Sequence, residues 1–202
     1  ERFKHIARRD AFPEVWAGIE EAERVGFRPL KINMVVMRGV NDDEVVEFAK
    51  LARTHPWHIR YIEFMPLDGD GIWSREKVFT AQEILDRISA LAPLEWVSEG
   101  LLSDPARIFR FKDGLGDIGI IASVSEPFCF ACDRIRFTPD GKLRTCLFSV
   151  TETDLKTPMR GGASDEEIAQ LIREGVQHKE AGHGINDPGF VKPIRAMYSI
   201  GG

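Results

Sequence analysis

Apolar residues recur at every third or fourth position in two early segments of the chain, a spacing typical of amphipathic helices. The first segment runs from Asp10 to Gly26, where a glycine is a common helix end. The second runs from Asn41 to about Thr54, and Asn41 and Glu44 have the spacing of a capping box. We predict a helix over each segment.

Capping boxes predict two later helices. Thr80 precedes Glu83 by three residues, and Ser164 precedes Glu167 in the same way, so each pair can satisfy free N–H groups of a first helical turn. Apolar residues follow each pair at helical spacing. We predict one helix after Thr80 and another from Ser164 to about His178.

Dense or alternating apolar residues predict the strands. Leu30–Met37 and His58–Met65 lie on either side of the second helix, which indicates a strand–helix–strand unit with parallel strands. Arg107–Phe111 and Asp117–Ala122 flank Asp113-Gly114, which is typical of a hairpin. The chain therefore combines parallel and antiparallel pairing, and its fold class is α/β.

A second hairpin is predicted from Arg134–Thr138 and Lys142–Leu147, which flank the turn residues Pro139-Asp140-Gly141. The first 66 residues thus have a parallel α/β pattern, and the remainder has a mixed α+β pattern. One strand–helix–strand unit cannot make a complete parallel sheet. The first part either adds to a sheet outside this sequence or packs on the second part.

Charge and composition exclude several classes of protein. The net charge is −5 and the isoelectric point about 5.6, which disfavours a general nucleic-acid binder. No apolar run approaches the roughly 20 residues of a membrane-spanning helix, so we expect no membrane protein. The first residues, Glu1–His5, do not have the pattern of a signal peptide and include no initiator Met, so we expect the chain to begin inside a longer protein.

The three cysteines form the most informative motif, Cys129-x2-Cys132-x13-Cys146, and the hairpin between them returns Cys146 toward the first two. Three buried thiols acting as small hydrophobic groups would be one interpretation. A structural zinc would need a fourth ligand, for which His178 and His183 are the candidates. An iron–sulfur cluster with three thiolates and one open iron fits best, in a reducing compartment.

Basic residues surround this motif. The segment Cys129–Cys146 holds four basic and two acidic residues in an otherwise acidic chain. Alternation puts Arg134 and Arg136 on one face of their strand, and we expect Ile135 and Phe137 to point into the core. Arginine binds phosphate oxygens bidentately, so these arginines predict a phosphate-bearing substrate, with a solvated basic face as the alternative.

Two further candidates lie on the parallel strands. Lys31 and Asn33 share one face of the first strand, where Lys31 could bind an anion or could protect a sheet edge. On the second strand, Arg60 alternates with Tyr61, Glu63 and Met65. Met65 and Pro66 come at its carboxyl end, where α/β proteins place their sites, although core packing is the simpler role for Met65.

Several stretches together resemble a known family. The run Phe128–Thr138, followed by Asp140–Leu143 and Cys146–Phe148, resembles molybdenum cofactor biosynthesis protein A, the family of radical S-adenosylmethionine GTP 3′,8-cyclases. Other stretches resemble its later barrel strands and its double-glycine tail: Lys31–Val35 with Gly39–Asn41, Arg60–Met65, and Ser199–Gly202. The resemblance extends over essentially the whole chain.

This resemblance implies a specific architecture. Residues 1–75 would be the last part of an incomplete radical-SAM-type (βα) barrel, and residues 76–202 a mixed α+β region with a second iron–sulfur site. The family uses two 4Fe–4S clusters, one of which binds S-adenosylmethionine through a Cys-x3-Cys-x2-Cys motif. That motif is absent from this sequence, so we expect the chain to lack activity by itself. The resemblance also implies a cytoplasmic homodimer that binds neither nucleic acid nor membranes.

The resemblance implies roles for the cysteines and for the end of the chain. Cys129, Cys132 and Cys146 would ligate the second 4Fe–4S cluster, whose open iron would bind the base of GTP. Gly201 and Gly202 would form a catalytic tail. Independently of the family, the segment 189–202 has basic but no acidic residues, and glycine lets the backbone approach a ligand closely.

The resemblance also implies contacts with the small molecules. Met65 would contact S-adenosylmethionine through its backbone. In the family reaction a 5′-deoxyadenosyl radical removes hydrogen from the ribose of GTP, and C3′ then joins C8, giving (8S)-3′,8-cyclo-7,8-dihydroguanosine 5′-triphosphate. Five residues would contact GTP: Lys31, Arg60, Arg134, Ile135 and Arg136.

Two other functions would use the same cysteines. A zinc-binding interaction module would need no chemistry beyond the metal. The auxiliary-cluster domain of another radical S-adenosylmethionine enzyme would act on a peptide. The paired arginines Arg134 and Arg136 and the double glycine favour a nucleotide over a peptide.

Overall fold

The computed structural model describes residues 1–97 and 101–201 and divides the chain into two compact units. The first unit comprises residues 1–63, 76–100 and 105–122, and the second comprises residues 64–75, 101–104 and 123–202. The sequence predicts a boundary between two regions at residue 75, where the pattern of predicted helices and strands changes. The compact units instead interleave along the sequence, because residues 76–97 pack with the first sheet.

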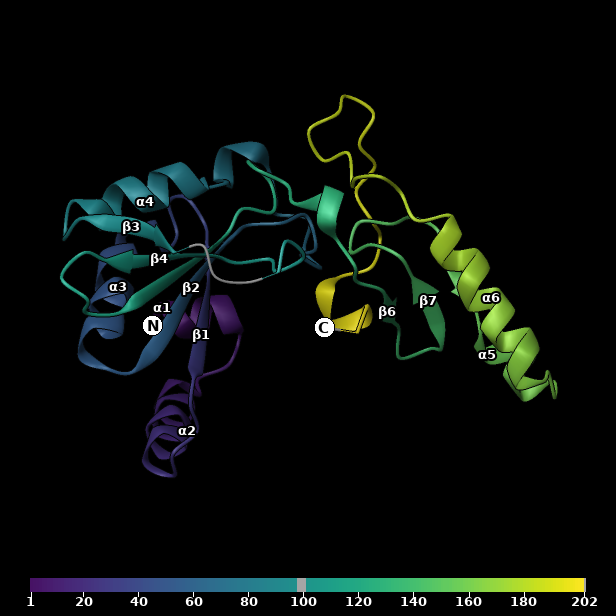
Figure 1. The fold of residues 1–202 in the computed structure, drawn as a ribbon, viewed down its shortest axis with the longest axis horizontal. Coiled ribbons are helices and arrows are strands. Elements are labelled where there is room, and N and C mark those ends of the chain that lie inside the picture. The colour runs from purple at the N-terminus through teal and green to yellow at the C-terminus, as the bar shows by residue number, and fades with distance from the viewer. Residues whose placement is uncertain (98–100, 202) are drawn as a thin grey trace. The chain divides into compact units, whose positions relative to one another are not determined.

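The first unit contains a mixed sheet with the strand order β1-β2-β5-β4-β3 (Figure 1). The pair β1–β2 and the pair β2–β5 are parallel, whereas β5–β4 and β4–β3 are antiparallel. The strands are β1 Leu30–Val36, β2 Trp57–Glu63, β3 Leu94–Val97, β4 Arg107–Phe111 and β5 Asp117–Ile121. The predicted strand–helix–strand unit and first hairpin are both confirmed, and they share one α/β sheet.

Helices α3 (Val45–Thr54) and α4 (Ala81–Ser89) pack against the side of the sheet that carries the core. The core includes Ile59, Tyr61 and Ile118, which are all fully buried. The Tyr61 hydroxyl donates to the carbonyl oxygen of Val45 at 2.7 Å. One side of the sheet is therefore apolar and covered by helices, as its alternating burial pattern requires.

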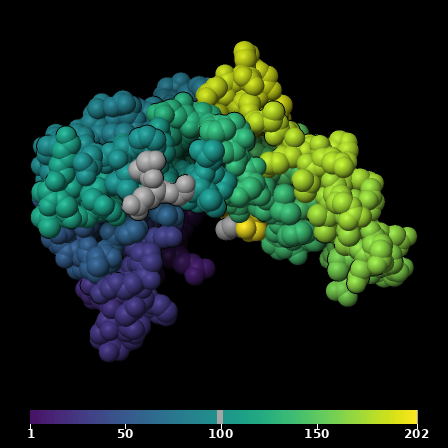
Figure 2. All heavy atoms as spheres, viewed as in Figure 1, coloured from purple at the N-terminus to yellow at the C-terminus, as the bar shows by residue number. Residues whose placement is uncertain are grey.

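The first of the two N-terminal helices has no counterpart among the predicted elements, and the second is less buried than its pattern predicts. They are α1 (Arg2–Ala7) and α2 (Phe12–Arg24). None of the residues of α2, all of which the structure describes, is buried, and its spheres stand at the surface in Figure 2. Only part of its apolar face contacts the core, where the Trp16 ring lies 5.7 Å from that of Trp57.

The capping boxes have different outcomes. The boxes of Thr80 with Glu83 and of Ser164 with Glu167 are confirmed with both reciprocal bonds. The predicted box at Asn41 is wrong, because its side chain bonds back to the end of β1. Its Oδ1 accepts from the N–H of Met37 at 2.7 Å and its Nδ2 donates to a backbone carbonyl of the strand. A 3-10 turn, η1 (Asp42–Glu44), therefore precedes α3.

The second unit is built around a small antiparallel sheet with the order β6-β7-β8. The predicted second hairpin is confirmed, but its strands are shorter than the pattern suggested. The strands are β6 Arg136–Phe137, β7 Lys142–Arg144 and β8 Thr153–Asp154. The helices are α5 Lys156–Arg160 and α6 Asp165–Gln177, with 3-10 turns η3 Cys129–Ala131 and η4 Met197–Ser199. A further 3-10 turn, η2 Arg75–Lys77, lies where the chain passes from the second unit to the first. Among the described residues, no helix is long and apolar enough to cross a membrane.

Candidate functional site

All three cysteines are free thiols and half-buried in the second unit. Cys129 begins the turn η3, and the N–H of Cys132 donates to the carbonyl oxygen of Cys129 at 3.1 Å. Cys146 follows the end of β7 by two residues. A short turn therefore orders the first two cysteines, and the β6–β7 hairpin carries the chain on to the third.

Cationic groups lie beside these thiols. Lys179 Nζ donates to the carbonyl oxygens of Arg134, at 2.9 Å, and of Thr145, and lies 3.8 Å from the Sγ of Cys132. Arg134 Nη1 lies 3.7 Å from the same sulfur. The Lys179 ammonium thus ties the segment after Cys132 to the residue before Cys146. Two positive charges at this place suit a thiolate or an anionic cluster.

The surroundings of Cys146 shift the pKa of its thiol. Burial raises the pKa of the Cys146 thiol, and the N–H of Phe148, which lies 3.5 Å from its Sγ, opposes that rise. The negative charge of the Cys129 thiolate also raises the pKa of Cys146.

The three cysteines belong to the donor set of both predicted metal sites, the zinc site and the iron–sulfur cluster. Among the described residues, no three His, Cys, Asp or Glu side chains group closely enough to hold a single metal ion. His178 Nδ1 lies 2.7 Å from the carbonyl oxygen of Glu174, and His183 Nδ1 accepts from the N–H of Ile185. The bond at Nδ1 of His178 leaves its Nε2 available, since a metal-bound histidine commonly bonds a backbone carbonyl through its other ring nitrogen. The described residues show neither a zinc site nor a cluster site, so the choice between the two stays a prediction.

The two arginines near the cysteines are more buried than the apolar residues that alternate with them. Arg134 and Arg136 are half-buried, and the Arg134 guanidinium stacks 5.4 Å above the ring of Phe128. Ile135 and Phe137 are 38% and 52% exposed, so the prediction that they point into the core is wrong. The inner position next to the thiols and Phe128 is filled by guanidinium groups, which leaves the apolar pair on the outside.

The Arg136 guanidinium is not fully neutralised by its surroundings. Burial lowers its pKa, and the neighbouring charge of Arg134 lowers it further, whereas Cys146 and Cys132 act in the opposite direction. A pair of desolvated cations is stabilised by a bound anion. This electrostatic arrangement can bind phosphate or another anionic group.

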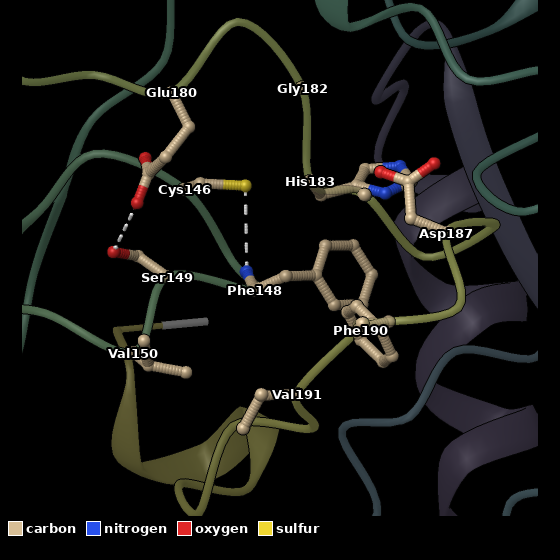
Figure 3. Close-up of a pocket in the computed structure, with 12 residues that line it drawn as sticks. Cys146, Phe148, Ser149, Val150, Glu180, Gly182, His183, Asp187, Phe190 and Val191 are labelled. Atoms are coloured by element: carbon tan, nitrogen blue, oxygen red, sulfur yellow. Dashed lines mark hydrogen bonds between the residues drawn. The ribbon is translucent and has the colours of Figure 1, made fainter.

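A cavity of about 390 Å³ adjoins Cys146 (Figure 3). Its walls include the rings of Phe148 and His183, whose centroids lie 4.6 Å apart. Burial lowers the pKa of His183, although the Asp187 carboxylate opposes the shift, so the imidazole is neutral near pH 7. Sequence reasoning treated His183 only as a zinc candidate and missed this aromatic wall.

The end of the chain packs on the β6–β7 hairpin of its own unit (Figure 1). Ile200 is fully buried, and Gly201 has a φ of +76°. A Cβ on Gly201 would lie 2.2 Å from the carbonyl oxygen of Phe137, so only glycine fits. Arg136 Nη1 donates to the carbonyl oxygen of Gly201 at 3.0 Å. Gly202 lies outside the described residues.

Lys31 and Arg60 lie in the first unit, on the side of the sheet opposite the core. Lys31 pairs in register with His58, and Asn33 pairs with Arg60, so these residues share one face. Lys31 is exposed, whereas Arg60 Nε is buried without a hydrogen-bond partner among the described residues. A Cβ on Gly119 would lie 2.9 Å from Arg60 Cγ, which shows that the arginine lies flat over that glycine.

Met65 belongs to the second unit and is half-buried just beyond the end of β2. Its carbonyl oxygen accepts from the N–H of Leu67 at 2.8 Å in a tight turn. The candidate residues thus fall into two sets. The second unit brings together the cysteines, the arginine pair and Gly201, and the first unit holds Lys31 and Arg60 on one sheet face.

Comparison with known proteins decides the family. The sequence model described as Molybdenum Cofactor Synthesis C matches residues 57–185, which include all three cysteines and both arginines. The chain belongs to this family. The chain also matches curated relatives along nearly its whole length, which confirms the resemblance identified from the motifs.

The relatives of this Molybdenum Cofactor Synthesis C chain include proteins named GTP 3′,8-cyclase. The one from Mycolicibacterium smegmatis is 44% identical over 99% of this chain and 56% of its own length. The one from Streptomyces coelicolor is 44% identical over 99% of the chain and 59% of its own length, and that from Moorella thermoacetica 43% over 100% and 62%. The chain therefore spans little more than half the length of these relatives.

Proposed function

We propose that this chain is the part of a GTP 3′,8-cyclase that binds the second 4Fe–4S cluster and supplies part of the GTP-binding site. The observation that carries the proposal is the contact of the half-buried Arg134 with the free thiol of Cys132, at 3.7 Å, with the half-buried Arg136 two residues further on. Anion-binding side chains and metal-binding side chains thus lie in one region of the second unit. The names of the relatives, which share about 44% identity, support the same reaction.

Cys129, Cys132 and Cys146 are the residues that would hold the cluster. Their chemistry fits, because all three are free thiols, and Lys179 and Arg134 supply positive charge next to Cys132. When bound, a cluster with three thiolate ligands offers an open iron to an atom of the substrate. The contribution of the protein is to orient the thiolates and to balance their charge.

Two sets of side chains, each described within its own unit, would contact GTP. Arg134 and Arg136 offer guanidinium forks to its anionic groups, and the exposed Ile135 side chain offers an apolar contact. On the first unit, Lys31 is exposed and Arg60 has an unpaired buried Nε, so each can take an anionic or carbonyl oxygen. Met65 would contribute a backbone contact to S-adenosylmethionine.

Gly201 and Gly202 would complete the site as a backbone tail. Gly201 lies against the hairpin that carries Arg136, and its carbonyl oxygen already accepts from that arginine. Its positive φ and its close approach to Phe137 exclude any side chain at this position. The tail thereby brings backbone groups next to the arginine pair.

A chimera tests this proposal. The chain would replace the matching part of the Mycolicibacterium smegmatis relative, and the purified chimera would be reconstituted with iron and sulfide without oxygen. With S-adenosylmethionine and a reductant it should convert GTP into a cyclic nucleotide in which C3′ is bonded to C8. The matched control is the chimera with Cys146→Ser. Binding of GTP without any such product in a correctly loaded chimera would refute the assignment.

A further inference from the structure

Arg195 joins three segments of the second unit. Its Nη2 donates to Asp140 Oδ2 at 2.7 Å, in the turn of the β6–β7 hairpin, and to Glu152 Oε2 at 3.0 Å, just before β8. Its Nε lies 2.6 Å from Glu152 Oε1. Its Nη1 donates to the carbonyl oxygen of Ser199 at 3.4 Å, at the end of η4.

We propose that Arg195 is a positioning residue that holds the C-terminal tail on the hairpin carrying Arg136. The inference rests on the proposed function of the tail, in which Gly201 and Gly202 act at the GTP site. Within the described part of the chain, Arg195 bonds Asp140, Glu152 and Ser199, none of which is a candidate ligand of the cluster or of GTP. It acts by keeping Ser199, Ile200 and Gly201 where they are.

The Glu152 carboxylate gives this contact a rigid base. It also bonds Arg144 Nη1 at 2.7 Å, and the side chains of Arg144 and Glu152 are only 3% and 14% exposed. Burial alone would raise the pKa of the Glu152 carboxyl, but the hydrogen bonds from Arg195 and Arg144 bring it below its ordinary value. A bidentate, partly buried pair within a network is more specific than an isolated surface pair.

The tail is held at both ends of a short segment. Arg195 contacts the turn of the hairpin through Asp140, and Gly201 contacts β6 of the same hairpin through Phe137 and Arg136. Between them the 3-10 turn η4 packs with its N-terminal amide bonded to the carbonyl oxygen of Leu67 at 3.0 Å. Loss of the Arg195 contact would free one end of this segment, and Gly201 would lose its register on the hairpin.

The first test measures the tail directly in the 202-residue chain. Hydrogen exchange by NMR would follow the amides of Met197, Ser199 and Ile200, which are hydrogen-bonded in the structure. In Arg195→Met these amides should exchange at least about tenfold faster, while amides of α6 should not change. Arg173→Met, on exposed α6, is the matched control and should leave the tail unchanged. Unaltered tail exchange in folded Arg195→Met would overturn the inference.

Two milder variants cover the case in which Arg195→Met does not fold. Asp140→Asn removes the negative charge of one exposed partner but keeps an amide oxygen that can accept from Arg195, so the tail amides should exchange only about two- to fivefold faster. Arg195→Lys keeps the charge but loses the fork, and should lie between wild type and methionine. Equal tail exchange in wild type, Asp140→Asn and Arg195→Lys would also count against the inference.

The second test separates this inference from the proposed function, in the chimera described above. If deletion of Gly201 and Gly202 leaves turnover intact, the proposed function of the tail fails. If the deletion abolishes turnover but Arg195→Met turns over normally, Arg195 is not a positioning residue. The expected result is a fall in kcat of about tenfold or more in Arg195→Met, a smaller change in the KM for GTP, and normal iron content.

Discussion

Arg136 Nη1 donates a hydrogen bond to the carbonyl oxygen of Gly201 at 3.0 Å. One of the two arginines beside the cysteines therefore already contacts the end of the chain. The same guanidinium has further N–H groups for an anion. The tail and a bound GTP can thus share this side chain, which links the position of the tail to substrate binding.

Substitution Arg136→Ala should weaken GTP binding in the reconstituted chimera. A charge-assisted contact contributes about 1.5–3 kcal/mol, so affinity should fall by roughly tenfold or more. Iron content should not change, because Arg136 is no cluster ligand in this assignment. Isothermal titration with GTP measures the effect, and Arg160→Ala on exposed α5 is the control. A normal affinity in Arg136→Ala would remove this residue from the site.

Substitution Gly201→Ala should displace the tail and leave the fold intact. The new Cβ would lie 2.2 Å from the carbonyl oxygen of Phe137, and the φ of +76° is strained for alanine. Turnover in the chimera should fall by orders of magnitude, as with deletion of Gly201 and Gly202, while folding and iron content stay normal. Gly162→Ala, at a positive-φ glycine in open space, is the control for backbone strain alone. Full activity in Gly201→Ala would contradict a role of Gly201 in turnover.

Each cysteine should be required for iron binding. Anaerobic reconstitution of the 202-residue chain should give about four irons per chain, with the absorption of a 4Fe–4S cluster. Cys129→Ser, Cys132→Ser or Cys146→Ser should each lower the iron content sharply, since three thiolates hold the cluster in this proposal. Iron and absorption are measured on the same samples. Stoichiometric zinc that survives all three single substitutions would contradict the cluster.

The 202-residue chain by itself should not cleave S-adenosylmethionine. Its sequence contains no Cys-x3-Cys-x2-Cys motif, so it has no candidate ligands for the cluster that binds this cofactor. The reconstituted 202-residue chain, incubated with S-adenosylmethionine and dithionite, should form no 5′-deoxyadenosine above a protein-free blank. Chromatography measures the product, and the chimera is the positive control. Product formation by the chain alone would show that another site activates the cofactor.

Docking of the tail should withstand mild acid. Hydrogen bonds from Arg195 and Thr138 hold the pKa of Asp140 well below its ordinary 3.8, and the Glu152 pKa also lies below its ordinary 4.5. Carboxyl groups with lowered pKa values stabilise the folded arrangement above their ordinary pKa, and this contribution is lost as the pH falls through the lowered values.

The amide resonances of Ser199 and Ile200 should therefore hold their positions from about pH 8 to about pH 5 and move only below about pH 4. Two-dimensional NMR of the 202-residue chain measures this. Asp140→Asn should narrow the pH range over which the tail stays docked on the hairpin. A transition between about pH 6 and pH 7 would point to a histidine and not to these carboxylates.

Local signals in the sequence were sufficient for most of the elements. The strand–helix–strand unit, both hairpins and the capping boxes at Thr80 and Ser164 follow from apolar spacing and from side chains within three residues of each other. Such interactions need no distant partner, so the sequence reveals them. The three cysteines and two arginines also lie within 18 positions of one another, and within this stretch the structure places Arg134 beside Cys132.

Contacts between distant residues could not be predicted in this way. Asn41 bonds back to β1 instead of capping a helix, and the apolar Ile135 and Phe137 face outward because Arg134 and Arg136 occupy the inner side. Alternation defines two faces of a strand but does not say which face is inside. That choice depends on which groups pack opposite, and those groups come from other parts of the chain.

The sequence by itself determined the α/β class, the family and the residue types that could bind a cluster and an anion. Only the tertiary structure decided how the end of the chain is held. Arg195 and Asp140 are 55 positions apart, and Arg136 and Gly201 are 65 apart. No periodic pattern connects residues at such separations. Their pairing depends on the paths of the loops when the hairpin, β8 and the tail pack together. Only then do the donor and acceptor atoms come within hydrogen-bond distance.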